Sequence, residues 1–320
     1  MASVAQIPDD NIADIQDYKA NSLWRLTLRR ILRQRSAIVG ISILAVIAFL
    51  AIFAPVIAPF DPTDVLIGKE EGIRKRQPPC IHLLGCDENQ PQHLLGTDGN
   101  VRDVFSRMLY GARVSLQIGF IVVTVAAVSG TLLGALAGYV GGTIDNIIMR
   151  IMDIFLAFPF LLLAISIVFV LGPGLTNAML AISIVSMPGY ARVVRAAVLS
   201  IRETDYVEAS RAMGASHFQI LIKRILPNAV PPLIVLATLG VATAILDTAA
   251  LSFLGLGAQP PTPEWGTMLG SERNQLFSAP HLVFVPGIAI SITVLAFNLL
   301  GDGLRDALDP RLVNAGRDKG

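Results

Sequence analysis

Charge is scarce in this chain. Only 15% of its 320 residues are Asp, Glu, Lys or Arg, whereas 53% are apolar, and the mean hydropathy is +0.62. Soluble globular domains carry about 25% charged residues, and a chain with so few cannot cover its apolar surface with polar groups. The composition therefore excludes an ordinary soluble domain and indicates a protein that lies in a membrane.

The sequence also lacks the patterns of a nucleotide-binding or catalytic protein. It has no G-x-x-x-x-G-K-[ST] phosphate loop, because its one Gly-Lys pair, Gly68-Lys69, lies in the wrong surroundings. Its four histidines fall in predicted loops and form no cluster with catalytic groups. We therefore expect no covalent chemistry, no cofactor or metal bound by this chain, and no nucleic-acid partner.

Long apolar segments are what the sequence does contain. A transmembrane helix needs about 20 mostly apolar residues to cross a hydrocarbon core of about 30 Å. Helices are expected because lipid leaves unpaired backbone groups unsatisfied, and no series of alternating ten-residue strands suggests a barrel. The predicted fold is an all-α polytopic membrane protein with six transmembrane helices, at residues 36–58, 114–139, 151–171, 175–190, 229–253 and 282–300.

The distribution of Lys and Arg predicts the orientation of these spans. Both residue types are enriched in the segments that lie inside if the N-terminus is cytoplasmic, as the positive-inside rule requires. An amphipathic stripe before the first span predicts a helix that lies on the lipid of the inner leaflet. The expected organisation is a cytoplasmic tail (1–35), a six-helix membrane domain (36–302) with an external loop (59–113) and a cytoplasmic loop (200–228), and a cytoplasmic C-terminal tail (303–320).

The cytoplasmic loop carries the signals of two short helices. Asp205, followed three residues later by Glu208, predicts a capped helix start, and Gly214 predicts a left-handed stop. Ser216 and Gln219 predict a second capping box. We expect a rigid helix pair there, although a pair that merely connects two spans is an alternative. The second helix should lead up to Leu226-Pro227 with one apolar face, formed by Phe218, Leu221, Ile222 and Ile225.

Particular residues of this loop resemble those of a known family. Glu208-Ala209-Ser210, Gly214 and Leu226-Pro227 are similar to the E-A-A, G, L-P loop of permease subunits of bacterial ABC importers, with Ser210 in place of the usual third alanine. Further stretches resemble the second, C-type permease of the dipeptide and oligopeptide transporters, and the resemblance runs from about residue 21 to 311. These stretches are residues 96–116, 149–165, 251–269 and 298–311.

The resemblance implies a type I ABC importer permease in the bacterial inner membrane, forming half of a translocation pathway for di- or oligopeptides. It implies a B-type permease, two ATP-binding subunits that hold ATP and Mg, and an extracytoplasmic substrate-binding protein as partners. Nickel, glutathione or another small solute is an alternative cargo. A self-contained secondary transporter and a membrane enzyme are the rival classes. The residues implied to dock the ATPase are Glu208, Ala209, Ser210, Gly214, Ala215, Leu226 and Pro227.

One position departs from the family pattern. Val101 stands before Arg102-Asp103, where the family usually has glycine. If this turn needs a positive φ, a β-branched residue should strain it.

Polar and proline residues inside the predicted spans also require an explanation. Asp247 lies in the fifth span, where it could line the pathway or bind the partner permease. The structural alternative is a carboxylate that is protonated or hydrogen-bonded to a neighbouring helix. Arg150 and Asp153 are three residues apart and are expected to pair on one helix face. Pro159 and Pro188 are expected to kink their helices.

The two cysteines, Cys80 and Cys86, fall in the predicted external loop. Because that loop faces an oxidising compartment, a disulfide is the first hypothesis. A Cys2His2 metal site with His82 and His93, or a pair of free thiols, is the alternative.

Overall fold

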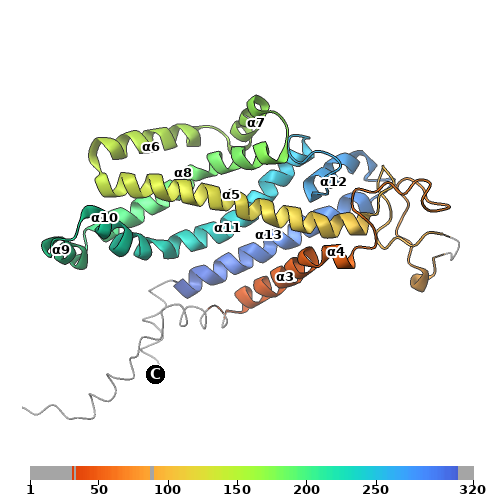
Figure 1. Cartoon of the computed structure of the whole chain (residues 1–320), viewed down its shortest axis with the longest axis horizontal. Coiled ribbons are helices and arrows are strands. Elements are labelled where there is room, and N and C mark those ends of the chain that lie inside the picture. The colour runs from red at the N-terminus through yellow and green to blue at the C-terminus, as the bar shows by residue number, and fades with distance from the viewer. Residues whose placement is uncertain (1–30, 32–33, 87–89, 309–320) are drawn as a thin grey trace, which may run out of the picture.

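The computed structural model describes residues 31, 34–86 and 90–308 as a helical bundle (Figure 1). The helix predicted on the inner leaflet falls almost entirely outside these residues. In the described part of the chain, five helices are long and apolar enough to span a membrane, counting the helical segments from His217 to Phe253 as one. They are α3 (Arg35–Ile52), α5 (Val104–Val140), α8 (Leu175–Arg202), α11 (Leu226–Phe253) and α13 (His281–Leu308). α11 is the last part of the continuous helical stretch from His217 to Phe253.

Several helix bounds differ from the predicted spans. α3 ends at Ile52, and the four-residue α4 (Ala54–Ile57) follows it, with Pro55 in its first turn. α5 begins at Val104, ten residues earlier than expected, and α8 continues to Arg202 rather than ending near Tyr190. Pro188 lies inside α8, which continues on both sides of it. The bounds differ because hydropathy finds only the apolar part of a helix, whereas the backbone hydrogen bonds of the helix continue into its polar ends.

The predicted third span is bent at Pro159, where a kink was expected. It is divided into α6 (Gly142–Ala157) and α7 (Phe160–Leu171), which meet at an angle of 96°. Pro159 causes the break, because it lacks an N–H and drives the preceding residue, Phe158, into extended backbone (φ −92°, ψ 144°). The 12 residues of α7 reach only about 18 Å at 1.5 Å per residue. The pair is therefore a broken span or a re-entrant segment.

The closest helix packing lies between α5 and α8, which run side by side (Figure 1). Gly130, Gly134 and Gly138 repeat every four residues on α5 and face the backbone of α8. A Cβ at Gly138 would lie 2.9 Å from the Arg195 carbonyl oxygen, and one at Gly134 would overlap the carbonyl group of Ala191. Small residues at this spacing permit the close backbone approach on which membrane helices depend for packing.

Ion pairs connect α6 to α8. Arg195 binds Asp145 through two hydrogen bonds of 2.5 and 2.6 Å. Asp153 pairs with Arg192 at 2.5 Å, not with Arg150, so the predicted pairing along one helix face is wrong. Charged side chains within spans pair with one another because an unpaired charge in lipid is costly.

One end of the bundle, here named the loop end, consists of residues 58–86, residues 90–103 and α12 (Trp265–Glu272). Trp265 and Leu282 pack there with Val104 and Ala51, and the Trp265 indole N–H donates to the Met108 carbonyl at 3.1 Å. The opposite end holds the N-terminus of α3, the C-terminus of α13 and the short helices α9 (Asp205–Ala212) and α10 (His217–Ile220) (Figure 1).

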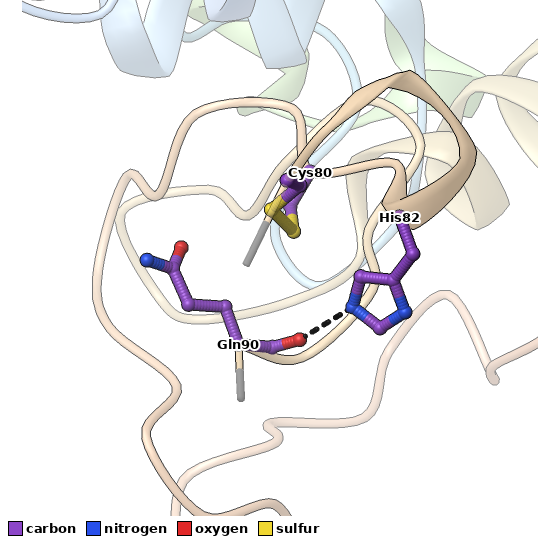
Figure 2. The surroundings of a disulfide bond; sticks show 4 residues. Cys80, His82 and Gln90 are labelled. Carbon is purple, nitrogen blue, oxygen red and sulfur yellow. Dashed lines mark hydrogen bonds between the residues drawn. A yellow bond between two sulfur atoms is a disulfide. The ribbon is translucent and has the colours of Figure 1, made fainter. Parts of the chain in front are cut away.

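A disulfide closes a small turn at the loop end. It joins Cys80 to Cys86, and His82, within the turn, donates from Nε2 to the Gln90 carbonyl at 2.8 Å (Figure 2). The second histidine of the alternative metal site, His93, hydrogen bonds to carboxylates instead. Among the described residues no three His, Cys, Asp or Glu side chains are grouped to hold a metal ion.

The glycine contact between α5 and α8 leads to a stability prediction. Gly134→Ala should lower the free energy of unfolding by about 1–3 kcal/mol, because the new methyl group overlaps backbone rather than a mobile side chain. Thermal unfolding of the purified protein in detergent measures the loss. Gly287→Ala in α13 is the matched control, since its Cβ would meet only a Leu269 methyl at 3.6 Å. Equal melting temperatures for the two variants would contradict this packing.

Candidate functional site

The helix pair begins at Thr204. Its backbone is extended and it is the N-cap of α9, while Asp205 is the first helical residue. The predicted cap by Asp205 is therefore wrong by one position, and the Thr204 hydroxyl donates to the Ile201 carbonyl instead of capping. Asp205 and Glu208 both lie in the first turn, where negative charge interacts favourably with the helix dipole.

The turn between the two helices is as predicted. Gly214 has φ +84°, a conformation that costs glycine little and other residues more. Ser216 then caps α10, and both bonds of its capping box with Gln219 are present at 3.3 Å. A Cβ at Gly214 would have no atom within 4 Å, so this turn presents open surface.

The pair is fastened to the bundle through apolar side chains. Val207, Ile220 and Ile225 are fully buried in a cluster with Val194 and Val198 of α8. The predicted apolar face of the second helix is confirmed for Leu221 and Ile225, which pack in this cluster, and is wrong for Phe218 and Ile222, which are exposed. α10 lasts only one turn before the helix widens, so a 3.6-residue period does not describe which side chains point inward.

The second helix does not end at Leu226-Pro227. A π-helical turn, η2 (Leu221–Ile225), joins α10 directly to α11, so one continuous helix runs from His217 to Phe253. Pro227 lies in the first turn of α11. Because proline has no N–H, one backbone hydrogen bond of an α-helix is missing at this position. Asn228 completes the connection, since its side-chain amide donates to the Arg224 carbonyl at 2.6 Å and to the Tyr206 hydroxyl at 3.2 Å.

The residues expected to dock a partner divide into two groups. Glu208, Ala209, Gly214 and Pro227 are exposed. Ser210 is buried and donates to the Tyr206 carbonyl at 2.8 Å, while Ala215 and Leu226 pack against the apolar cluster. Sequence reasoning missed two exposed apolar side chains beside this surface, Met213 (78% exposed) and Phe218 (73%). The only sign of their exposure in the sequence is that both apolar residues stand in an otherwise polar loop.

Asp247 lies on α11 near the loop end. Its carboxylate is half-buried and makes no hydrogen bond or ion pair within the described part of the chain. It shares a helix face with Gly240 and Thr243, which line a groove between α5, α8 and α11. The Tyr190 hydroxyl lies against Gly240 in this groove, and no pattern in the sequence indicated that side chain.

A network of charges holds the loop end together. Arg76 pairs with Glu272 at 2.8 Å, and Arg102 pairs with Asp98 at 2.8 Å. Val101, which lies between Asp98 and Arg102 in the chain, is buried and has φ +59°. The turn therefore does require a positive φ, as the departure from glycine suggested, and a left-handed conformation costs a side-chain-bearing residue about 1–2 kcal/mol.

His93 is the most enclosed titratable group of this network. Its Nδ1 lies 2.8 Å from Asp103 and its Nε2 lies 3.1 Å from Glu70, with the Phe60 ring beside it. Burial lowers the pKa of His93, but the hydrogen bonds and charges of Asp103 and Glu70 outweigh it and raise the pKa above 6.5. The protonated ring can donate to both carboxylates at once.

Comparison with known families identifies the class of this bundle. The family described as "Binding-protein-dependent transport system inner membrane component" matches residues 130–314, and "N-terminal TM domain of oligopeptide transport permease C" matches residues 22–79. The chain belongs to this class of inner-membrane transport components, and within it to the C-type permeases of dipeptide and oligopeptide ABC importers. Its relatives are membrane transport components rather than enzymes.

Individual relatives cover nearly the whole chain. The dipeptide transport system permease protein DppC of Alkalihalophilus pseudofirmus is 46% identical over 95% of this chain and 96% of its own length. The di/tripeptide permease DppC of Pseudomonas aeruginosa is 50% identical over 88% and 90%. The glutathione permease GsiD of Pectobacterium atrosepticum is 44% identical over 93% and 94%.

A solved structure shares the fold. The inward-facing MetNI methionine ABC transporter has a chain that is 26% identical, with a TM-score of 0.52, over 64% of this chain and 98% of its own. The bundle therefore has the type I importer permease fold.

The buried histidine predicts a pH-dependent stability. Because the folded pKa of His93 lies above its ordinary value of 6.5, the protonated ring should stabilise the fold fully below about pH 6.5. That contribution should be lost as the pH rises through the folded pKa. Melting temperatures of the protein and of His93→Gln, measured from pH 5 to 9, should differ most at the acidic end. A difference that grows with pH would contradict the assignment.

Proposed function

We propose that this chain forms half of the translocation pathway of an ATP-driven importer of di- or oligopeptides. A B-type permease supplies the other half, and two ATP-binding subunits hold ATP and Mg and drive the cycle. An extracytoplasmic protein delivers the cargo. This chain itself holds no nucleotide and serves as the moving part, with both termini in the cytoplasm of a bacterial inner membrane.

The observation that carries this proposal is the continuity of the helix pair with a span. α10, η2 and α11 form one helix, and α9 is fastened to it by the bond between Tyr206 and Asn228. A force applied to α9 and α10 therefore reaches α11 without passing through a flexible loop. Rigid elements of this kind can convert closure of two motor subunits into rocking of membrane helices.

The outer surface of the pair supports its role as a docking site. Glu208, Ala209 and Gly214 are accessible there, next to the exposed side chains of Met213 and Phe218. Large apolar side chains exposed together at the end of a folded element mark a protein contact. We propose that they enter a groove of the ATP-binding subunit, with Glu208 at the helix start and Gly214 allowing close approach.

The termini support the orientation. The N-terminus of α3 packs against the C-terminal part of α13, where a Cβ at Gly303 would overlap the Ala37 methyl and approach its backbone at 3.1 Å. Both ends lie at the end of the bundle that holds the helix pair (Figure 1). If that pair faces the cytoplasm, so do the ends of α3 and α13, while the loop end with its disulfide faces outward, where thiols are oxidised.

Glutathione is the second candidate cargo. It is favoured by relatives named as glutathione permeases, which are 44% and 45% identical to this chain. Glutathione is itself a small peptide, so the same pathway chemistry serves both cargoes. Measuring which compounds the delivering protein binds decides between them.

Variants at the turn test the docking role. Gly214→Val strains the left-handed turn and adds bulk, whereas Gly214→Asn adds bulk in a conformation that asparagine tolerates. Both should insert in the membrane, yet lose most of the ATP-binding subunit on co-purification and most peptide uptake, because the added atoms project into the contact.

Gly85→Asn is the matched control. Gly85 also has a left-handed backbone (φ 93°, ψ 18°) and open space around it, but it lies at the loop end. It should assemble and transport normally. Normal assembly and uptake by both Gly214 variants would refute the docking role.

A further inference from the structure

The groove between α5, α8 and α11 has a volume of about 190 Å³ and is mostly apolar. Its polar side chains are Ser186 and Tyr190 from α8 and Thr243 from α11. Tyr190 is only 5% exposed, yet its hydroxyl makes no hydrogen bond within the described residues. Tyr190 lines the groove, and its hydroxyl is not one of the fully enclosed polar atoms, so a ligand or water in the groove can bind it.

Asp247 extends this polar face toward the loop end. On α11 the groove is lined by Gly240, Thr243 and Ala244, and Asp247 follows one turn after Thr243 on the same side of the helix. It lies six residues before the end of α11, which is about 9 Å along the helix axis. In the proposed orientation, cargo entering from outside meets Asp247 first.

Asp247 differs from the other acids of the spans. Asp145 and Asp153 are neutralised by arginines of α8 at 2.5 Å, whereas Asp247 faces no cation within the described part of the chain. A carboxylate in a span is expensive unless it is paired or functional. The described part of the chain therefore supplies no counter-charge for Asp247.

We propose that Asp247 binds the protonated α-amino group of the peptide during its passage and so selects for cargo with a free ammonium. This rests on the proposed function. Thr243 supports the site, because its hydroxyl donates to the Gly240 carbonyl at 3.0 Å and keeps its lone pairs free to accept a second ammonium hydrogen. A single carboxylate in this position suits an ammonium better than a divalent metal, which requires several ligands.

The spacing along α11 fits the length of a short peptide. The Tyr190 hydroxyl lies against Gly240, and Asp247 is two helical turns further on, about 10 Å along the axis. Two or three extended residues span about 7–10 Å. With its ammonium at Asp247, such a peptide places its backbone or carboxylate within reach of the Tyr190 hydroxyl, which then gains an acceptor.

Transport by the reconstituted complex tests this inference. Proteoliposomes containing both permeases, the ATP-binding subunits and the delivering protein are supplied with radiolabelled dialanine. Asp247→Asn should lower the uptake rate by at least about tenfold, the amount that a charged hydrogen bond contributes, and Asp247→Glu should retain more. Unchanged uptake by Asp247→Asn overturns the inference. If the unmutated complex does not import dialanine, the proposed function fails instead.

Assembly and accessibility separate this role from a contact with the second permease. Asp247→Asn should co-purify with the B-type permease as the unmutated chain does, and loss of that pairing would assign the carboxylate to the interface and overturn the inference. Cys80 and Cys86 are joined, so Asp247→Cys adds a single free thiol.

That thiol should react with 2-aminoethyl methanethiosulfonate, because the proposal places it on the pathway. Ile292→Cys, on the exposed apolar stripe of α13, should not react. Equal reactivity at the two positions overturns the inference.

Discussion

The attachment of α9 and α10 to the bundle is the interaction on which the rest of this account depends. Val207, Ile220 and Ile225 exclude water from their contact with α8, and the helix continues through η2 into α11. Either connection alone would leave a hinge. Together they make the helix pair part of the membrane domain, so that a surface suited to a partner is also mechanically connected to the spans.

Lipid imposes the second constraint. The carboxylates of α6 are paired with arginines of α8, as Asp145 is with Arg195 and Asp153 with Arg192, because an unpaired charge in hydrocarbon is costly. The carboxylate of Asp247 has no such partner among the described residues, and the Tyr190 hydroxyl in the nearby groove makes no hydrogen bond there either. They belong to the surface that a polar cargo would cross, and the tight contact of α5 with α8 holds one wall of that surface in place.

Local signals in the sequence predicted the apolar segments, the Gly214 turn and the Ser216 capping box, because each depends on a few neighbouring residues. The direction of the chain after Pro159 could not be predicted, since hydropathy sums a window without regard to geometry. Pairing of Asp153 with Arg192 depends on packing between distant segments. α12 was missed because its N-cap is Glu264, a residue type that is not among the preferred caps.

The central claim is that the helix pair and α11 move as one body. Spin labels at Arg211 on α9 and Leu246 on α11, both exposed positions, report the distance between them in the assembled complex by pulsed electron resonance. If the helix pair and α11 move as one body, the distance is the same in the nucleotide-free complex and in the complex trapped with ATP. A change of several ångströms between the two states would show that the pair moves independently of α11 and would contradict the account.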